Sequence, residues 1–286
     1  MLECFISFKE THRIEDPRIQ EESPTPVIVN RAACFVLVIM WFFATANSDA
    51  MDKTEDIDTN RPSFMFSPLV VPQGSVQLEN GGLYQHFQHG INYFDASETQ
   101  VRLGVTKRAE LQMFVPYYVG THQSHTGDTV SGVTDLGEVG IKYQIGPIKK
   151  LQLSVIPSVN IPTGSQAVSG RGVQGLLRAP WAYPLNSKWS VMGMQSILLL
   201  NAGRDLQYQP DFMLNRSVGT KASVFAEYVG FFTQQAPSLQ IAHFGGVYKA
   251  KPHHQIDMHF GFGLDKIAPT AFIGSGYSYR FDKLPW

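Results

Sequence analysis

Four consecutive residues, His122-Gln123-Ser124-His125, have types and spacing that could support nucleophilic chemistry. A histidine two positions from a serine on one strand points to the same side and can accept the hydroxyl proton. Here, however, the pair falls in the polar stretch Gly120–Val133, which reads as a loop, and nothing fixes the nearby Asp128 against it. A solvated loop explains the pattern, so we predict no catalytic residue and no enzymatic activity.

A second cluster combines three histidines with a carboxylate, which are residue types that bind metals. It consists of His253, His254, Asp257 and His259. Asp257 and His259 share one face of a strand, but His254 belongs to the preceding turn, which would have to bring it round. Two polar residues on one face beside a turn are the simpler interpretation, and we predict neither a metal site nor a cofactor.

Charged residues on the polar faces of alternating segments give a sharper signal. They are Glu79, Arg102, Glu110, Lys142, Asp257 and Arg280. Along neighbouring segments the signs alternate, with Arg102 beside Glu110 and Glu110 beside Lys142. Asp257 is expected beside Arg280, which closure of the sheet would bring to Glu79. Buried charges must be paired, so interior packing would explain such a ladder. A polar constriction that selects a solute is the functional alternative, and both can hold.

Strands must position these charges. From Pro72 onward the sequence contains twelve runs in which apolar and polar residues alternate, a pattern typical of β-strands. In one run Ile256, Met258, Phe260 and Phe262 alternate with Asp257, His259, Gly261 and Gly263. In a soluble sandwich the apolar side would face a core. In a membrane barrel it faces lipid, and the polar side faces a lumen.

The connections between the runs alternate in length. Short basic or Pro/Gly turns such as Gly146–Lys150 alternate with longer polar segments such as His89–Ser97, Gly120–Val133 and Pro162–Gln174. Five short turns and six longer loops are what twelve antiparallel strands need when both ends of the chain face the periplasm. This regularity favours the barrel over the sandwich.

The first residues look like an export signal. An apolar run, Ala32–Phe43, follows Arg31 and ends in the small residues Ala44-Thr45-Ala46. We therefore expect residues 1–46 to be a leader and signal peptide, cleaved before Asn47. The acidic character of residues 1–30 indicates a natural start further downstream.

The region between the signal and the first strand carries no periodic pattern. We expect residues 47–71 to form an N-terminal periplasmic tail, with the acidic stretch Asn47–Asn60 mobile. Both cysteines, Cys4 and Cys34, precede it, so thiol chemistry is not expected in the mature chain. Charged residues make up 16% of the 286 residues, against about 25% in soluble proteins, and the net charge of −1 gives no sign of a nucleic-acid partner.

The last strand, Gly274–Phe281, alternates Tyr277, Tyr279 and Phe281 with small or charged residues. Such a C-terminal strand resembles the insertion signal of outer-membrane barrels, and Gly276, Tyr279 and Phe281 fit that signal. The usual signal ends on its last aromatic residue, whereas here residues 282–286 follow. We predict contacts with outer-membrane lipid and with the barrel-assembly machinery.

Seven short motifs occur along the chain in a fixed order. They are Asp58-Thr59-Asn60-Arg61-Pro62, Val71-Pro72-Gln73-Gly74, Leu103–Leu111, Asp135–Tyr143, Ile161–Ser165, Ala226-Glu227-Tyr228 and Gly276–Phe281. Together they resemble a bacterial outer-membrane family labelled for phenol meta-pathway degradation and often called simply "transporter". The resemblance covers roughly residues 57 to 281. It implies an outer-membrane barrel and uptake of small hydrophobic or aromatic compounds, and it supplies no catalytic residue.

The sequence thus predicts an all-β chain whose residues 72–286 form a single closed antiparallel transmembrane β-barrel of about twelve strands in a bacterial outer membrane. Its predicted function is passive passage of a small, hydrophobic or aromatic solute. Two alternatives remain open at this point: a structural barrel with a closed lumen, and an outer-membrane lipid hydrolase that acts through Ser124.

Overall fold

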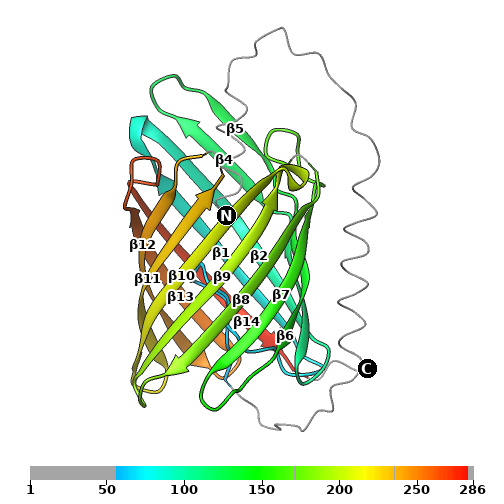
Figure 1. Ribbon diagram of the computed structural model, residues 1–286. Coiled ribbons are helices and arrows are strands. Elements are labelled where there is room, and N and C mark those ends of the chain that lie inside the picture. The colour runs from blue at the N-terminus through cyan, green and yellow to red at the C-terminus, as the bar shows by residue number, and fades with distance from the viewer. Residues whose placement is uncertain (1–55, 171, 235, 283–286) are drawn as a thin grey trace.

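One antiparallel sheet makes up the computed structural model, which describes residues 56–170, 172–234 and 236–282 (Figure 1). Its strands are β1 (Val76–His86), β2 (Ile91–Gly104), β3 (Ala109–Val115), β4 (Tyr118–Gln123), β5 (Thr129–Val133), β6 (Leu136–Gln144), β7 (Gln152–Ile161), β8 (Gln174–Pro184), β9 (Trp189–Leu200), β10 (Asp205–Val218), β11 (Ala222–Thr233), β12 (Leu239–Lys251), β13 (His254–Gly263) and β14 (Ala271–Phe281).

The sheet closes on itself because β1 pairs with both β14 and β2. Two of the wall strands are interrupted. β3 and β4 both pair with β2 and are separated at Pro116, which has no N–H to donate to the ladder. β5 and β6 face them and are separated at Thr134 and Asp135. The fourteen segments therefore form a closed barrel of twelve strands, which confirms the predicted fold.

Two expected loops are largely strand. The predicted loop His89–Ser97 is mostly the start of β2, and β1 and β2 are joined through the short 3-10 turn η2 (Gln88–Gly90). The predicted loop Gly120–Val133 contains the end of β4 and all of β5, which pair as a hairpin. Both predictions were wrong because the polar residues of these stretches resemble a loop, whereas β2 and β4 pair with each other and bury Tyr93 and Val119. No helix in the described part of the chain, η3 (Asn201–Gly203) included, is long and apolar enough to cross a bilayer.

The two faces of the barrel wall are those expected from alternation. Ile256, Met258, Phe260 and Phe262 on β13 are 44–60% exposed on the outer surface. Asp257 and His259, between them, are 2% exposed and face inward. A surface with large apolar side chains outside and buried polar side chains inside is what a barrel in lipid requires.

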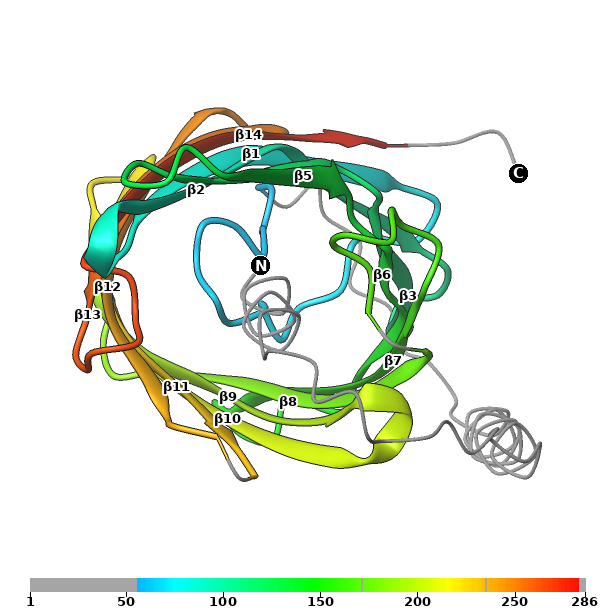
Figure 2. The same cartoon turned by 90° about the horizontal axis from the view of Figure 1, so that it is seen from above.

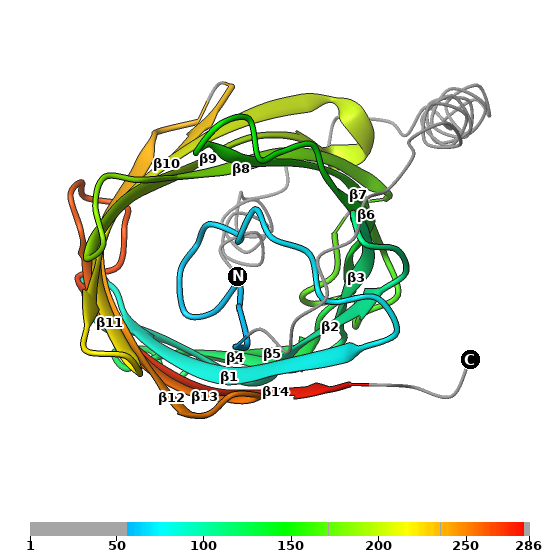
Figure 3. The ribbon, with the colours of Figure 1, turned by 90° about the horizontal axis from the view of Figure 1, so that it is seen from below.

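Residues 56–75 run inside the ring of strands, and we call them the lumen segment (Figures 2 and 3). Ile57, Met65 and Val71 are at most 2% exposed. The described part of the expected periplasmic tail, residues 56–71, thus differs from the prediction, because these apolar side chains are buried against the barrel wall. The predicted signal peptide and its cleavage before Asn47 lie outside the described residues.

Candidate functional site

Four of the six predicted lumen charges form one buried cluster, which we call the anchor: Glu79, Arg102, Glu110 and Lys142. Arg102 donates from Nε to Glu110 at 2.8 Å and from Nη1 to Glu79 at 2.9 Å. Lys142 Nζ lies 3.1 Å from the same oxygen, Glu110 Oε1. All four residues are 0% exposed. The pairs on Glu110 are those expected from alternation: Lys142 lies directly opposite Glu110 on β6, and Arg102 is its diagonal neighbour on β2.

The anchor holds the lumen segment by its backbone. Glu110 accepts the N–H of Val71 at 2.6 Å, and Glu79 accepts the N–H groups of Asn60 and Arg61 at 2.9 and 3.0 Å. Arg102 donates to the carbonyl oxygens of Asp58 and Leu69, both at 3.0 Å. Lys142 also lies 3.3 Å from the Leu69 carbonyl. These contacts satisfy backbone groups that would otherwise be buried without partners in the lumen.

Asp257 and Arg280 do not form the predicted pair. In the β13–β14 register Asp257 lies opposite Gly276, four residues along β14 from Arg280, so the two side chains are far apart. Arg280 pairs with Asp282 at 2.7 Å, and Asp257 pairs with Arg61 of the lumen segment at 3.3 Å. The predicted contact of Arg280 with Glu79 is also replaced, because Glu79 pairs with Arg102. The prediction failed because the register is set by turns whose geometry the sequence does not reveal.

Arg61 links the lumen segment to β2, β13 and β14 of the wall. It was not among the predicted site residues. Its Nη1 lies 3.2 Å from Glu98 and its Nη2 donates to the Ser275 carbonyl at 3.2 Å. Glu98 and Asp257 balance the charge of the Arg61 guanidinium, since both carboxylates lie within 3.3 Å of it. The guanidinium packs against the wall at two glycines, since a Cβ at Gly81 would lie 2.0 Å from its Cζ.

Gly276 is the second of these glycines, and a Cβ there would lie 2.4 Å from Arg61 Nε. The other two residues of the expected insertion signal, Tyr279 and Phe281, pack edge to face with ring centroids 4.3 Å apart. Phe281 is 46% exposed on the outer surface. The part these three residues play in insertion remains a prediction, but Gly276 also leaves room for the segment.

The tip of the lumen segment, Phe64–Phe66, reaches the opposite wall. There Glu227 on β11 accepts the N–H groups of Phe64 and Met65 at 3.3 and 3.2 Å. Glu227 also bonds His243 Nδ1, and we call this pair the catch. His243 Nε2 in turn lies 2.9 Å from His259 Nδ1, and its ring packs edge to face on Phe64 at 5.0 Å.

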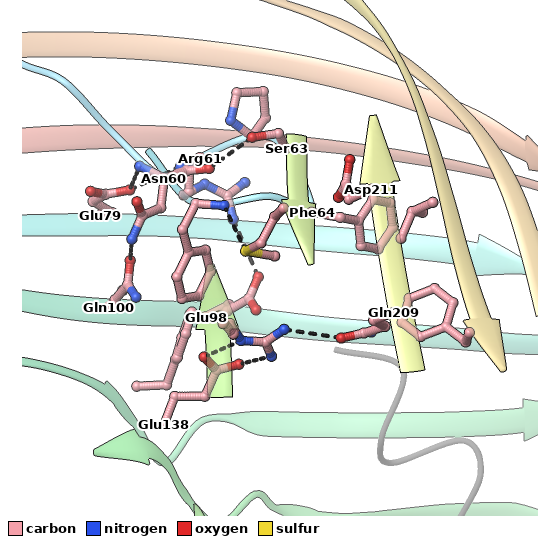
Figure 4. Close-up of a pocket in the computed structure, with 17 residues that line it drawn as sticks. Asn60, Arg61, Ser63, Phe64, Glu79, Glu98, Gln100, Glu138, Gln209 and Asp211 are labelled. Carbon is pink, nitrogen blue, oxygen red and sulfur yellow. Dashed lines mark hydrogen bonds and ion pairs between the residues drawn. The ribbon is translucent and has the colours of Figure 1, made fainter. Parts of the chain in front are cut away.

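A cavity of about 100 Å³ lies above the tip (Figure 4). The lumen segment supplies one side of it, including Arg61, Phe64 and Phe66, and the wall supplies the rest from β1 to β11. On the wall, Arg178 donates to both carboxylate oxygens of Glu138, at 2.6 and 3.0 Å. Glu138 sits at a bulge of β6 with φ 46°, a strained conformation for a residue with a side chain. Strained residues of this kind gather at functional sites.

The residues that were considered and rejected as catalytic or metal-binding groups have other partners. Ser124 Oγ lies 3.1 Å from Asn92 Nδ2, and His122 Nδ1 lies 3.2 Å from Thr129 Oγ1. His253 pairs with Asp282, and His254 with the Tyr277 hydroxyl. Among the described residues, no group of three or more His, Cys, Asp or Glu side chains could hold a metal ion.

Comparison with known proteins agrees with this architecture. A family described as "Putative MetA-pathway of phenol degradation" matches residues 59–281. No curated protein matches the chain in sequence. The crystal structure of an outer membrane channel from Pseudomonas putida F1 is similar with a TM-score of 0.59 and 14% identity, over 74% of this chain and 97% of that one. The NanC porin is similar with a TM-score of 0.50 and 11% identity, over 71% and 98% of the two chains.

At these identities the two structures show the fold alone, which is that of porin-like outer-membrane barrels. That fold and the apolar outer face place the chain in a bacterial outer membrane.

Proposed function

The chain belongs to the family described as "Putative MetA-pathway of phenol degradation", which matches residues 59–281, and from this premise we propose that it is a channel for passive passage of a small hydrophobic or aromatic solute. The solute enters the barrel from the outer side and passes the lumen segment, which acts as a gate. No covalent step and no cofactor is part of this proposal. The observation that carries it is the cavity, which ends on the tip of the lumen segment.

Two features of the lumen support passage of an apolar body. The cavity wall includes the aromatic rings of Phe64, Phe66, Phe114 and Phe231. The charges beside them are held in pairs, such as Arg178 with Glu138 and Arg61 with Glu98. Paired charges exert weaker fields on a passing solute than single ones.

The base and the tip of the lumen segment are also held by different numbers of contacts, which suits a gate. Its base is bound by four charged residues of the anchor, whereas its tip is bound by the catch and by side-chain packing. We propose that the tip leaves the catch while the base stays on the anchor.

Current recordings of the purified full-length protein in planar bilayers test the channel. We expect single-channel currents that are interrupted reversibly when phenol is added to the side of the long hairpin β4–β5. Currents that phenol does not interrupt would count against an aromatic solute.

A structural barrel with a closed lumen is the second candidate, because the anchor residues and much of the segment are fully buried. It predicts no conductance from the native protein in the same recordings. Ser124→Ala, which should leave any lipid hydrolysis unaffected, tests the hydrolase alternative.

A further inference from the structure

We propose that the barrel binds an anionic phospholipid at a specific site on its outer surface, on the rim formed by the short turns. The lipid head group lies against Arg216 and Trp189 and is attracted by the lysines of the neighbouring turns. The inference does not depend on the proposed channel, because the site faces the membrane and not the lumen. It is carried by an arginine on the lipid-facing side of a strand and by a patch of cations around it.

Arg216 lies on the outer face of β10, close to the end of that strand. Leu214 and Val218, two residues away on either side, are 42% and 51% exposed on the outer surface, whereas Met213 is 7% exposed and faces inward. Because side chains alternate along a strand, Arg216 faces outward as well. A charged residue on this face is costly at the middle of a bilayer but costs little at its edge, which is where the end of β10 lies.

Trp189 on β9 holds the guanidinium at the level of the lipid head groups. The two residues are directly opposite each other in the β9–β10 register, and Arg216 Cζ lies 5.2 Å from the centre of the Trp189 ring. Tryptophan rings in membrane proteins collect at the interface between head groups and acyl chains. The planar guanidinium can stack on the ring and still donate from its edge. Within the part of the chain that the structure describes, Arg216 has no ion pair, so these donors are available to a phosphate.

Lysines of the adjoining turns extend the positive surface along the rim. The Lys188 carbonyl accepts the N–H of Ser217 at 2.8 Å, which places this lysine beside Arg216. In the next turn the Lys221 carbonyl accepts the N–H of Lys249 at 2.7 Å. Lys188 and Lys221 are exposed. Four cations therefore follow one another along the rim from β9 to β12.

The stretches of chain that carry these cations supply no carboxylate to balance them. Asp and Glu are both absent from residues 182–190, 214–226 and 245–256. Asp257 and Asp282, which belong to β13 and the end of β14, are already paired with Arg61 and Arg280. The patch thus keeps its positive charge, and clusters of this size attract anionic lipids.

The surroundings of Arg216 favour a lipid over a soluble anion. A phosphate accepts parallel hydrogen bonds from a guanidinium, and acyl chains can follow Leu214 and Val224, which are 42% and 47% exposed beside it. The rim lies opposite the long hairpin β4–β5 (Figure 1), and short turns face the periplasm, so the lipid belongs to the inner leaflet. A zwitterionic lipid would bring its ammonium group close to several lysines, which is unfavourable.

Native mass spectrometry of the purified full-length protein tests the site. The protein in detergent is mixed with equal amounts of phosphatidylglycerol, which is anionic, and phosphatidylethanolamine, which is zwitterionic, both with the same acyl chains. The bound lipids are then counted. We expect the first phosphatidylglycerol to bind about tenfold more tightly than phosphatidylethanolamine, since each cation near the head group adds to the preference.

Three variants separate the site from a general effect of charge. Arg216→Gln should weaken the binding of phosphatidylglycerol about fivefold and that of phosphatidylethanolamine less. Arg216→Lys should recover part of this loss, because it restores the charge but not the planar fork. Arg204→Gln is the matched control and should change neither affinity, since Arg204 precedes β10 at the opposite rim and its loss changes the net charge equally.

Equal affinity of the unchanged protein for the two lipids, or an equal loss in Arg204→Gln and Arg216→Gln, would overturn the proposal. Displacement of phosphatidylglycerol by inorganic phosphate, at an ionic strength matched with chloride, would show a site for a soluble anion and would overturn it too. If Arg216→Gln does not fold, the double change Lys188→Gln and Lys221→Gln in the exposed turns should give a similar loss, and no loss there would count against the site.

Discussion

The lumen segment meets two walls of the barrel that hold it by different chemistry. On the side of β1, β2, β3 and β6 it is fixed by the anchor, in which two cations and two carboxylates are 0% exposed and form three ion pairs of 2.8–3.1 Å. On the side of β9–β12 it is held by two backbone hydrogen bonds to Glu227 and by aromatic packing.

This difference in contacts indicates which part of the lumen segment can move. A buried charge that loses its partner costs several kcal/mol, about 3–5 in measured cases. The two hydrogen bonds of the tip both go to one carboxylate, Glu227, and a hydrogen bond to a charged group is worth about 1.5–3 kcal/mol. The tip has fewer such contacts than the base, so we expect it to leave its wall first.

Glu110→Gln should have the largest effect, because it leaves Arg102 and Lys142 facing each other in a dry site. We expect the protein to lose about 3–5 kcal/mol of folding free energy, measured by denaturant titration of the barrel in lipid vesicles. The lost carboxylate should also shift the reversal potential of reconstituted pores toward anions.

His125→Ala in the outer hairpin serves as the control and should leave both quantities unchanged. If Glu110→Gln conducts with unchanged ion selectivity, the charges of the anchor serve packing alone and do not control which ions pass.

A substitution on the outside of the anchor wall comes next in size. Ile141 on β6 alternates with the inward-facing Lys142 and so lies on the outer face, and Ile141→Arg should cost about 2–4 kcal/mol in the same titration. The matched change Ile148→Arg lies in the exposed turn after β6, where Ile148 is 53% exposed, and should cost only about 0–1 kcal/mol. Equal costs would mean that the assigned lipid face is wrong.

Glu227→Gln directly tests the wall that holds the lumen segment by fewer contacts. It keeps the size of the side chain but replaces a carboxylate that accepts from Phe64, Met65 and His243 by a neutral amide. We expect a loss of about 1–3 kcal/mol and longer open times in single-channel records. Asp128→Asn, an exposed change in the β4–β5 turn, should do neither. Open times that fall in Glu227→Gln would show that the tip does not gate.

The smallest effect is expected at a glycine that packs only against the Arg61 side chain. Gly81→Ala would place a methyl group 2.0 Å from Arg61 Cζ and push the guanidinium aside. Because the end of a flexible side chain can give way, the cost should be about 1 kcal/mol or less, seen as a modest rise in conductance. Gly175→Ala, whose Cβ would come no closer than 3.8 Å to a neighbour, should be neutral. A loss for Gly81→Ala as large as that for Glu227→Gln would show that the guanidinium cannot move aside.

The sequence pattern predicted the strands of the barrel wall but not the lumen segment inside it. Alternation at Ile256–Phe262 predicted the two faces because a strand has a fixed period of two. The lumen segment has no such period, and its partners stand far away along the chain, as Arg61 does from Asp257, so composition alone made it a tail.

Two features of the sequence nonetheless pointed to a segment inside the barrel. Asp257 is an inward carboxylate with no cation opposite it on β14, which calls for a partner from outside the wall. The motif Asp58–Pro62, noticed only for its resemblance to a family, contains the residues that supply it.

The short link between the lumen segment and β1 has a consequence for competition. Val71, held by Glu110, is joined to Val76 at the start of β1 through a turn in which Ser75 bonds back to Pro72. A group tied by so short a tether returns to its site as though present at an effective concentration in the millimolar range. A free solute that competes with the segment must therefore offset this concentration as well as the affinity of the segment for its wall, and the concentration is lower at the tip, which is several residues further from the tether. This intramolecular competition is set by chain length and is independent of how much protein is in the membrane.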